Sequence, residues 1–89
     1  MATWKAVSKL LKVRASDCGG GQMGILLKRG HLWFQVSDVF GTEPLGWTVN
    51  DEDGKNYGQF SSEYWMEDRT SEFVARLIRH WAAEQGFTF

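Results

Sequence analysis

Cysteine and histidine are scarce in this chain of 89 residues. The single cysteine, Cys18, excludes an internal disulfide framework, and with only two histidines it cannot supply a closed structural zinc site. No apolar run approaches the length of a membrane span, and no charged and then apolar signal segment opens the chain. This length is too short for two independent cores, so we expect one domain. We expect this domain to be cytoplasmic and to have no disulfides, metal or other cofactor.

Aromatic residues, in contrast, are abundant: five Trp, six Phe and two Tyr. Hydrophobic residues make up 43% of the chain and charged residues 24%, which is typical of a folded domain and not of a disordered one. Each aromatic side chain buries a large area, so a few of them can build a small core. The others are available as contact surface.

The charges are unevenly distributed, although the net charge is only −1. Residues 1–30 carry six basic side chains and one acidic one, a net charge of +5, whereas residues 31–72 carry nine acidic and two basic ones, a net charge of −7. Two interpretations stay open. The charges either decorate solvent-facing surfaces, or they make a dipolar molecule that steers an oppositely charged partner.

Residues 3–12 fit two kinds of secondary structure. Thr3 can cap a helix that carries Trp4, Val7, Leu10 and Leu11 on one side. The alternation of residues 9–16 fits a strand instead, and a short helical lead-in followed by a strand satisfies both patterns.

The middle of the chain shows the alternation and the turn residues of a β-sheet. Leu32, Phe34 and Val36 alternate with less apolar positions, and an Asp-Gly pair marks a hairpin. The expected elements are a strand over 25–27, a turn at 28–30, a strand over 32–37, a loop over 40–46, a strand from 47, a hairpin turn at 51–54 and a return strand over 57–60.

The C-terminal segment changes to a helical period. Thr70 or Ser71 can cap the start of a helix, and Gly86 can end it. Its apolar residues recur at spacings of three and four and share one face: Phe73, Val74, Leu77, Ile78 and Trp81.

Residues 13–68 resemble the SH3 family in the order and spacing of short motifs. Residues 28–30 are similar to the basic turn before the family's second strand, and residues 46–47 to the Gly-Trp that opens its third strand. Residues 53–55 stand where the distal hairpin is expected, and residues 58–65 resemble the segment that enters a short 3₁₀ turn. The resemblance implies a small SH3-like barrel of about five antiparallel strands over 13–68. The helix over 70–85, which the helical period predicts, is extra to a minimal SH3 domain. We therefore expect a mainly β fold with a C-terminal α-helix, in one domain over 1–89.

The same resemblance implies an aromatic groove for proline-rich peptides, of which this chain keeps a part. Trp47 and Tyr64 match groove positions. The family's two ridge tyrosines are missing from residues 15–19, Ser61 replaces the groove proline, and Glu63 replaces the groove asparagine. We therefore expect proline-rich peptides to bind only weakly.

These features together predict a non-enzymatic protein–protein interaction module, or a small adaptor or inhibitor that docks on a larger protein through an aromatic and acidic face. Aromatic anchors ringed by polar residues are the usual energetic centre of an interface. The expected partner is another protein, folded or peptide, and no membrane. The predicted partner-binding residues are Trp47, Tyr64, Glu63, Glu43 and Trp65.

Nucleic acid is the alternative partner. Small barrels bind it through basic strips and stacking aromatic side chains. The acidic middle of the chain would repel phosphates unless the two charges lie on different faces. The predicted nucleic-acid-binding residues are Lys5, Lys9, Lys12 and Arg14.

Patterns that suggest catalysis or metal binding are incomplete. Cys18 precedes three glycines, but no spacing ties His31 or His80 to it as a base. The acidic turn at 51–53 does not follow the calcium-loop pattern, because its sixth and twelfth positions are Asn56 and Ser62. We expect no catalytic residue and no metal site.

Overall fold

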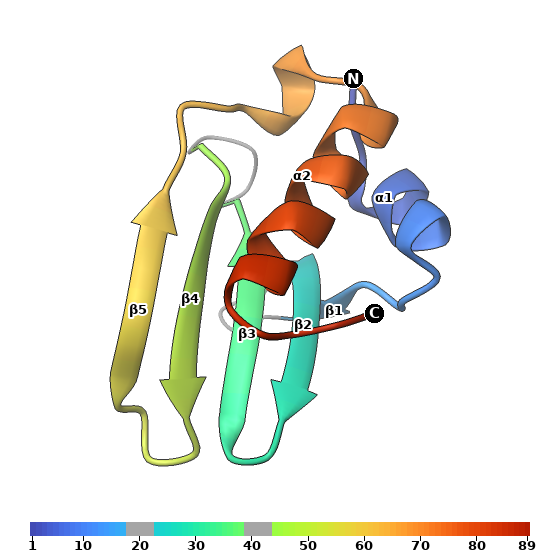
Figure 1. Ribbon diagram of the computed structural model, residues 1–89. Helices are drawn as coiled ribbons and strands as arrows, with labels where there is room; N and C mark the ends of the chain where they lie inside the picture. The colour runs from blue at the N-terminus through green and yellow to red at the C-terminus, as the bar shows by residue number, and fades with distance from the viewer. Residues whose placement is uncertain (18–22, 39–43) are drawn as a thin grey trace.

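The computed structural model describes residues 1–17, 23–38 and 44–89 (Figure 1). An N-terminal helix precedes a series of strands, and a second, longer helix follows them. Neither helix in these ranges is long and apolar enough to cross a membrane. The elements are α1 Trp4–Leu11, β1 Ser16–Asp17, β2 Met23–Arg29, β3 Leu32–Ser37, β4 Gly46–Asp51, β5 Asn56–Ser61, the 3₁₀ helix η1 Met66–Asp68 and α2 Ser71–Glu84.

The strands form one antiparallel sheet in chain order, β1-β2-β3-β4-β5. The expected mainly β fold with five antiparallel strands and a C-terminal helix is therefore confirmed. The sheet is open, because within the described ranges β1 and β5 are its two edges and do not pair with each other. The closure into a barrel is not confirmed.

The register of the strands decides which side chains share a face. Ile25, Val36, Trp47 and Phe60 stand opposite one another in one row, and Leu27, Phe34, Val49 and Gly58 form the next row on the same face. The opposite face carries mostly polar side chains, since neighbouring residues of a strand point to opposite sides. Its rows are Leu26, Gln35, Thr48 and Gln59, and Gly24, Ser37, Gly46 and Ser61.

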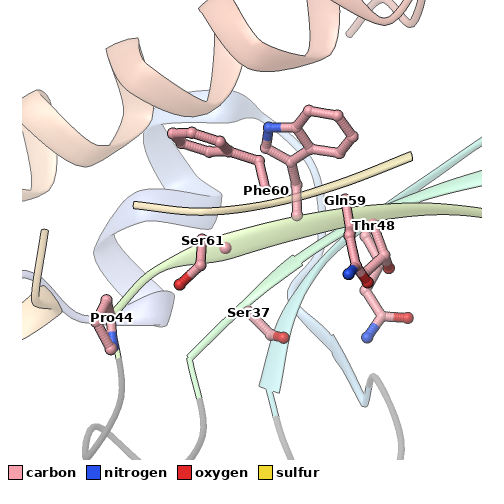
Figure 2. Close-up of a pocket in the computed structure, with 9 residues that line it drawn as sticks. Ser37, Pro44, Thr48, Gln59, Phe60 and Ser61 are labelled. Atoms are coloured by element: carbon pink, nitrogen blue, oxygen red, sulfur yellow. The ribbon is translucent and has the colours of Figure 1, made fainter. Parts of the chain in front are cut away.

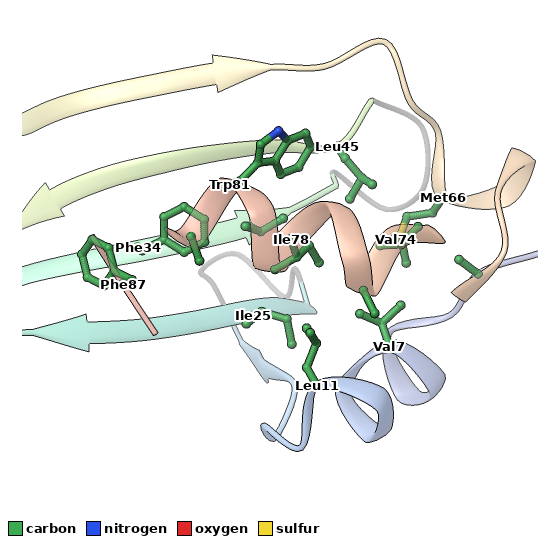
Figure 3. Close-up of a cluster of buried hydrophobic side chains, with 14 of the residues drawn as sticks. Val7, Leu11, Ile25, Phe34, Leu45, Met66, Val74, Ile78, Trp81 and Phe87 are labelled. Carbon is green, nitrogen blue, oxygen red and sulfur yellow. The ribbon is translucent and has the colours of Figure 1, made fainter. Parts of the chain in front are cut away.

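Both helices lie on one side of the sheet, and the core is enclosed between them and the apolar rows (Figures 1 and 3). Helix α1 packs on α2 and also touches β2. The largest fully buried side chains come from both helices, from strands β2 and β3 and from the segment before β4: Phe34, Leu11, Ile25, Leu45, Ile78, Val7, Val36 and Val74.

The structure decides between the two alternatives for the N-terminal segment. Residues 4–11 are helical, and the Thr3 hydroxyl accepts a hydrogen bond from the Ala6 N–H at 3.2 Å. The strand alternative for residues 9–16 is wrong, because only Ser16 of that range pairs into the sheet. Val7 and Leu11 stand four residues apart, so they share one face of the helix, and both are buried in the core.

Helix α2 begins and ends close to the expected residues, and the chain beyond it turns back onto the sheet. The Thr70 hydroxyl accepts a hydrogen bond from the Phe73 N–H at 3.1 Å, which caps the helix. After the helix, the Phe87 ring lies 5.5 Å from that of Phe34. The Arg29 guanidinium donates to the Gly86 carbonyl at 2.9 Å and thereby fixes this tail.

Candidate protein-interaction site

Trp47, the central residue of the expected contact face, lies in β4 on the side of the sheet that the helices cover. Its ring centroid is 6.0 Å from that of Phe34 and 6.3 Å from that of Phe60. The indole lies over Gly58, since a Cβ at that position would be in van der Waals contact with the Trp47 ring at 3.4 Å. Trp47 is consequently half-buried and forms part of an aromatic cluster.

The outer member of this cluster is Phe60 in β5. Its ring is 47% exposed and stands edge-on to the Trp81 ring of α2, with 5.8 Å between the centroids. Trp81 itself is only 7% exposed. Trp47, Phe60 and Trp81, which we call the aromatic ledge, therefore form an apolar surface beside α2 that rises from the core to solvent at Phe60.

Strand β5 is a free edge of the sheet, since no described strand pairs with its outer side (Figure 1). The Ser62 N–H, just beyond the strand, donates to the Leu45 carbonyl at 2.9 Å and so points toward β4. Backbone groups alternate in direction along a strand, so those of Gln59 and Ser61 point away from β4. No residue from 56 to 61 is charged or a proline, the residue types that commonly protect an edge.

A hydrogen-bonded turn closes one end of this edge. The Asp51 carboxylate accepts the N–H groups of Asp53 and Lys55, both at 2.9 Å, and the Tyr57 hydroxyl at 3.0 Å. The backbone bond from Lys55 is the main cause that lowers the pKa of Asp51 below its ordinary value. The hydrogen bond to Asp51 is likewise the main cause that raises the pKa of the Tyr57 phenol.

The other end of the edge leads into the second predicted aromatic residue, Tyr64. Its ring packs edge-on against Phe73 of α2 with 5.1 Å between the centroids, and the Arg69 guanidinium lies 4.7 Å from the Tyr64 ring centre. Glu63 is exposed beside it, and Trp65 is half-buried. Among the described residues no ring contact joins Tyr64 to Trp47, so the two lie in separate aromatic clusters.

Polar side chains line a shallow hollow of about 520 Å³ on the opposite face of the sheet. Figure 2 shows Thr48, Gln59 and Ser61 pointing away from the helices, whereas Phe60 points toward them. Gln59 therefore contributes its side chain to this hollow and its backbone to the free edge.

The predicted nucleic-acid residues lie on and just after α1. Lys5, Lys9, Lys12 and Arg14 are all exposed. The Arg79 guanidinium of α2 donates to the Leu10 carbonyl at 2.9 Å and so adds a fifth cation at the end of α1. A cation at a helix C-terminus also favours the helix dipole.

Glu43 and Cys18 lie outside the described residues. Within the described ranges no three metal-ligating side chains gather in one place.

Comparison with models of protein families, with curated proteins and with solved structures found no match to this chain.

The sequence interpretation missed Phe60, Trp81 and Gln59 as parts of a surface. Phe60 and Trp81 were assigned only to a strand and a helix face, because their proximity arises from the packing of α2 on the sheet. The signal that was present is the last strand of the series, which has no charged residue and no later strand to pair with.

Proposed function

We propose that this protein is a non-enzymatic protein-interaction module whose partner adds a strand to β5 and covers the aromatic ledge. The observation that carries the proposal is the uncharged free edge, with the backbone groups of Gln59 and Ser61 directed outward beside the exposed ring of Phe60. In strand addition, main-chain hydrogen bonds supply affinity and alternate side chains supply specificity.

The aromatic ledge adds an apolar contact area to the backbone hydrogen bonds that the edge can form. An exposed aromatic ring that leans on a buried one resembles the anchor of an interface, since binding removes a large apolar area from water. Lys55 and Glu63, both exposed, border the edge at its two ends and form a polar rim. Trp47 and Glu63 of the predicted contact face belong to this surface, and Tyr64 with Trp65 lies just beyond its end.

Photo-crosslinking in cells that express the protein tests this proposal. Phe60→p-benzoylphenylalanine places the reactive ring on the ledge, and Phe89→p-benzoylphenylalanine is the matched control, because the two side chains are 47% and 43% exposed. We expect a crosslinked second polypeptide from position 60 and none from position 89. The absence of a product from position 60, or equal products from both positions, would contradict the proposal.

The finer likeness to an SH3 barrel over residues 13–68 belongs to the same proposal. It predicts that a proline-rich peptide shifts the NMR signals of Trp47 and Tyr64, weakly because the ridge tyrosines are missing. Amide and indole spectra during titration with such a peptide measure this. A peptide that shifts neither residue removes the proline-rich ligand and leaves strand addition at β5 as a separate question.

Nucleic acid is a second candidate ligand, favoured by one contact. The bond from Arg79 to Leu10 brings a cation of α2 to the lysines of α1. If these residues neutralise phosphates, the affinity for a short DNA duplex falls with salt with a logarithmic slope of about −4. Lys9→Gln should reduce that slope by about one, whereas the control Lys55→Gln, outside α1, should not change it. A slope near zero, or no binding at low salt, would exclude this candidate.

A further inference from the structure

We infer that the partner of β5 is a second copy of this chain, paired antiparallel so that Gln59 faces Gln59 of the second copy across a two-fold axis. This inference rests on the proposed function of the edge and specifies its partner. The two sheets then continue into each other, with all helices on the same face. Three properties decide which residues of the two strands pair: the faces on which the side chains lie, the shapes of the opposing side chains, and the charges at the ends of the strands.

The faces of the two sheets restrict the axis to a residue. Directly opposite residues of an antiparallel pair share one face, so Phe60 of both copies stays on the helix side only if the axis passes through a residue and not between two. Gly58, Gln59 and Phe60 are the central candidates. With the axis at Gln59, which directs its backbone outward, the two copies of this residue exchange both of their N–H to carbonyl bonds.

The packing of opposing side chains favours Gln59, among these three residues, as the one on the two-fold axis. With the axis there, Gly58 faces Phe60 of the second copy in a pair without mutual hydrogen bonds, where side chains approach most closely. Gly58 has no side chain on the ledge, whereas Phe60 is 47% exposed. Each phenyl ring therefore reaches the Trp47 indole that lies over the other copy's glycine and extends that aromatic cluster.

Charge selects the same register. An axis at Gln59 brings the end of β5 that Lys55 flanks beside the end that Glu63 of the second copy flanks, twice by symmetry. An axis at Gly58 would instead bring Asp53 alongside Glu63, two like charges that repel. An axis at Phe60 would set the two Phe60 rings directly against each other, with no glycine opposite either ring.

The acidic turn comes near Glu63 and the acidic segment 67–68 of the second copy, which limits the strength of the dimer. Two of the three carboxylates of this turn are engaged within their own chain: Asp51 by its three hydrogen bonds, and Glu52 at 3.6 Å from the His31 Nδ1. Asp53 remains. We therefore expect a reversible dimer with a micromolar dissociation constant, as for other small interfaces.

The assembly stops at two copies. Within the described residues the opposite edge consists of the two-residue β1 and of the part of β2 beyond it, and neither takes part in this interface. A two-fold interface uses the same surface of both subunits and is then closed, so no filament forms.

Sedimentation analysis from about 10 µM to 1 mM tests the dimer, which should approach twice the chain mass of 10.2 kDa. Gln59→Pro removes an N–H group that points outward and makes no bond to β4, so this variant should be monomeric. Gln59→Ala keeps the N–H and should still dimerise. Circular dichroism and urea unfolding establish that both variants fold. A monomeric wild-type protein over this range overturns the inference.

Charge reversal tests the register with variants that leave the edge backbone intact. Lys55→Glu and Glu63→Lys should each weaken the dimer about fivefold, since each converts two attractive contacts into two repulsive ones. The double variant should regain the wild-type dissociation constant. Lys9→Glu on α1, which makes the same charge change as Lys55→Glu away from β5, serves as a control for net charge. A double variant as weak as the single variants overturns the proposed register.

Cysteine crosslinking locates the two-fold axis directly. In a Cys18→Ser background, Gln59→Cys should form an intermolecular disulfide under mild oxidation, because the Cα atoms of a hydrogen-bonded pair stand about 5.5 Å apart. Ser61→Cys, which faces Tyr57, should not link to itself. Equal linking of both variants, or linking of Ser61→Cys alone, contradicts the assignment of the axis.

The product of photo-crosslinking at position 60 separates this inference from the proposed function. A product of twice the chain mass supports both. A product with a different protein only retains the interaction module but overturns the second copy as its partner, and no product at all overturns both.

Discussion

Asp51 shows how one side chain can organise the turn between two strands. The sequence marks the turn with an Asp-Gly pair, and Gly54 indeed adopts a positive φ of 83°. The carboxylate of Asp51 then accepts three hydrogen bonds from residues that follow it in the turn and in β5. These bonds hold Lys55 and Tyr57 at the end of the free edge, so Asp51 positions residues that border the proposed dimer interface.

The titration of Tyr57 tests this network. Its raised pKa means that the fold favours the neutral phenol, so the contribution to stability is complete below pH 10.0 and is lost as the pH rises through the folded-state pKa. In a Tyr64→Phe background, phenolate absorbance follows Tyr57 alone, and Asp51→Asn should lower its pKa. An unchanged titration curve would show that Asp51 does not hold the phenol.

The lowered pKa of Asp51 acts at the opposite end of the pH scale. Its contribution to stability is present above the ordinary value of 3.8 and is lost as the pH falls through the folded-state pKa. Because the side chain lies at the surface, this contribution is small, and NMR titration of its carboxyl carbon measures it better than unfolding does.

Helix α1 illustrates how an element is fixed by a single polar contact as well as by packing. The Trp4 indole N–H donates to the Asp38 carboxylate at 2.8 Å, across 34 positions of the chain, and Asp38 is only 6% exposed. The sequence predicted Trp4 on the apolar side of this helix. In the structure its N–H is engaged inside the protein, where it ties α1 to the end of β3.

Removal of this donor should destabilise the protein. Trp4→Phe retains an aromatic ring but leaves the buried Asp38 carboxylate without its indole partner, which should lower the free energy of unfolding by about 1–3 kcal/mol. Urea unfolding measures the change, and Lys5→Ala, exposed on the same helix, should stay within about 0.5 kcal/mol of the wild type. Equal stabilities of the two variants would show that the contact contributes nothing.

At the scale of the whole molecule, the C-terminal tail completes the core. Figure 3 shows Phe87 beside Phe34 at the end of α2, and Phe87 is 2% exposed. Arg29 holds the tail through the Gly86 carbonyl, and its guanidinium lies 5.3 Å from the centre of the Phe87 ring. The chain after the helix is thus an integral part of the fold, although the helical pattern ends at Gly86.

Two phenylalanines of this tail provide a matched comparison. Phe87→Ala should lower the free energy of unfolding by about 3 kcal/mol, because it leaves a cavity against Phe34. Phe89→Ala should change it by less than about 0.5 kcal/mol, since that ring is 43% exposed. Urea denaturation of both variants decides the matter, and similar losses would mean that the tail acts as a unit without a dominant side chain.

The sequence by itself determined the features that depend on near neighbours. The alternation of Leu32, Phe34 and Val36 predicted β3 and its buried face, and the Asp-Gly pair predicted the hairpin between β4 and β5. The cap at Thr70 and the apolar spacing up to Trp81 predicted α2. These patterns are read within one element, where dihedral preferences and the side-chain period suffice.

Tertiary structure decided what depends on residues far apart in the chain. Residues 3–12 fitted a helix and residues 9–16 a strand, and the packing of Val7 and Leu11 into the core decided for the helix. No local pattern tells that Trp47 lies against Phe60, that both meet Trp81, or that the sheet stays open at β5. The candidate site arises from that open edge, because an edge is defined by the absence of a neighbour in space and not by any residue of its own strand.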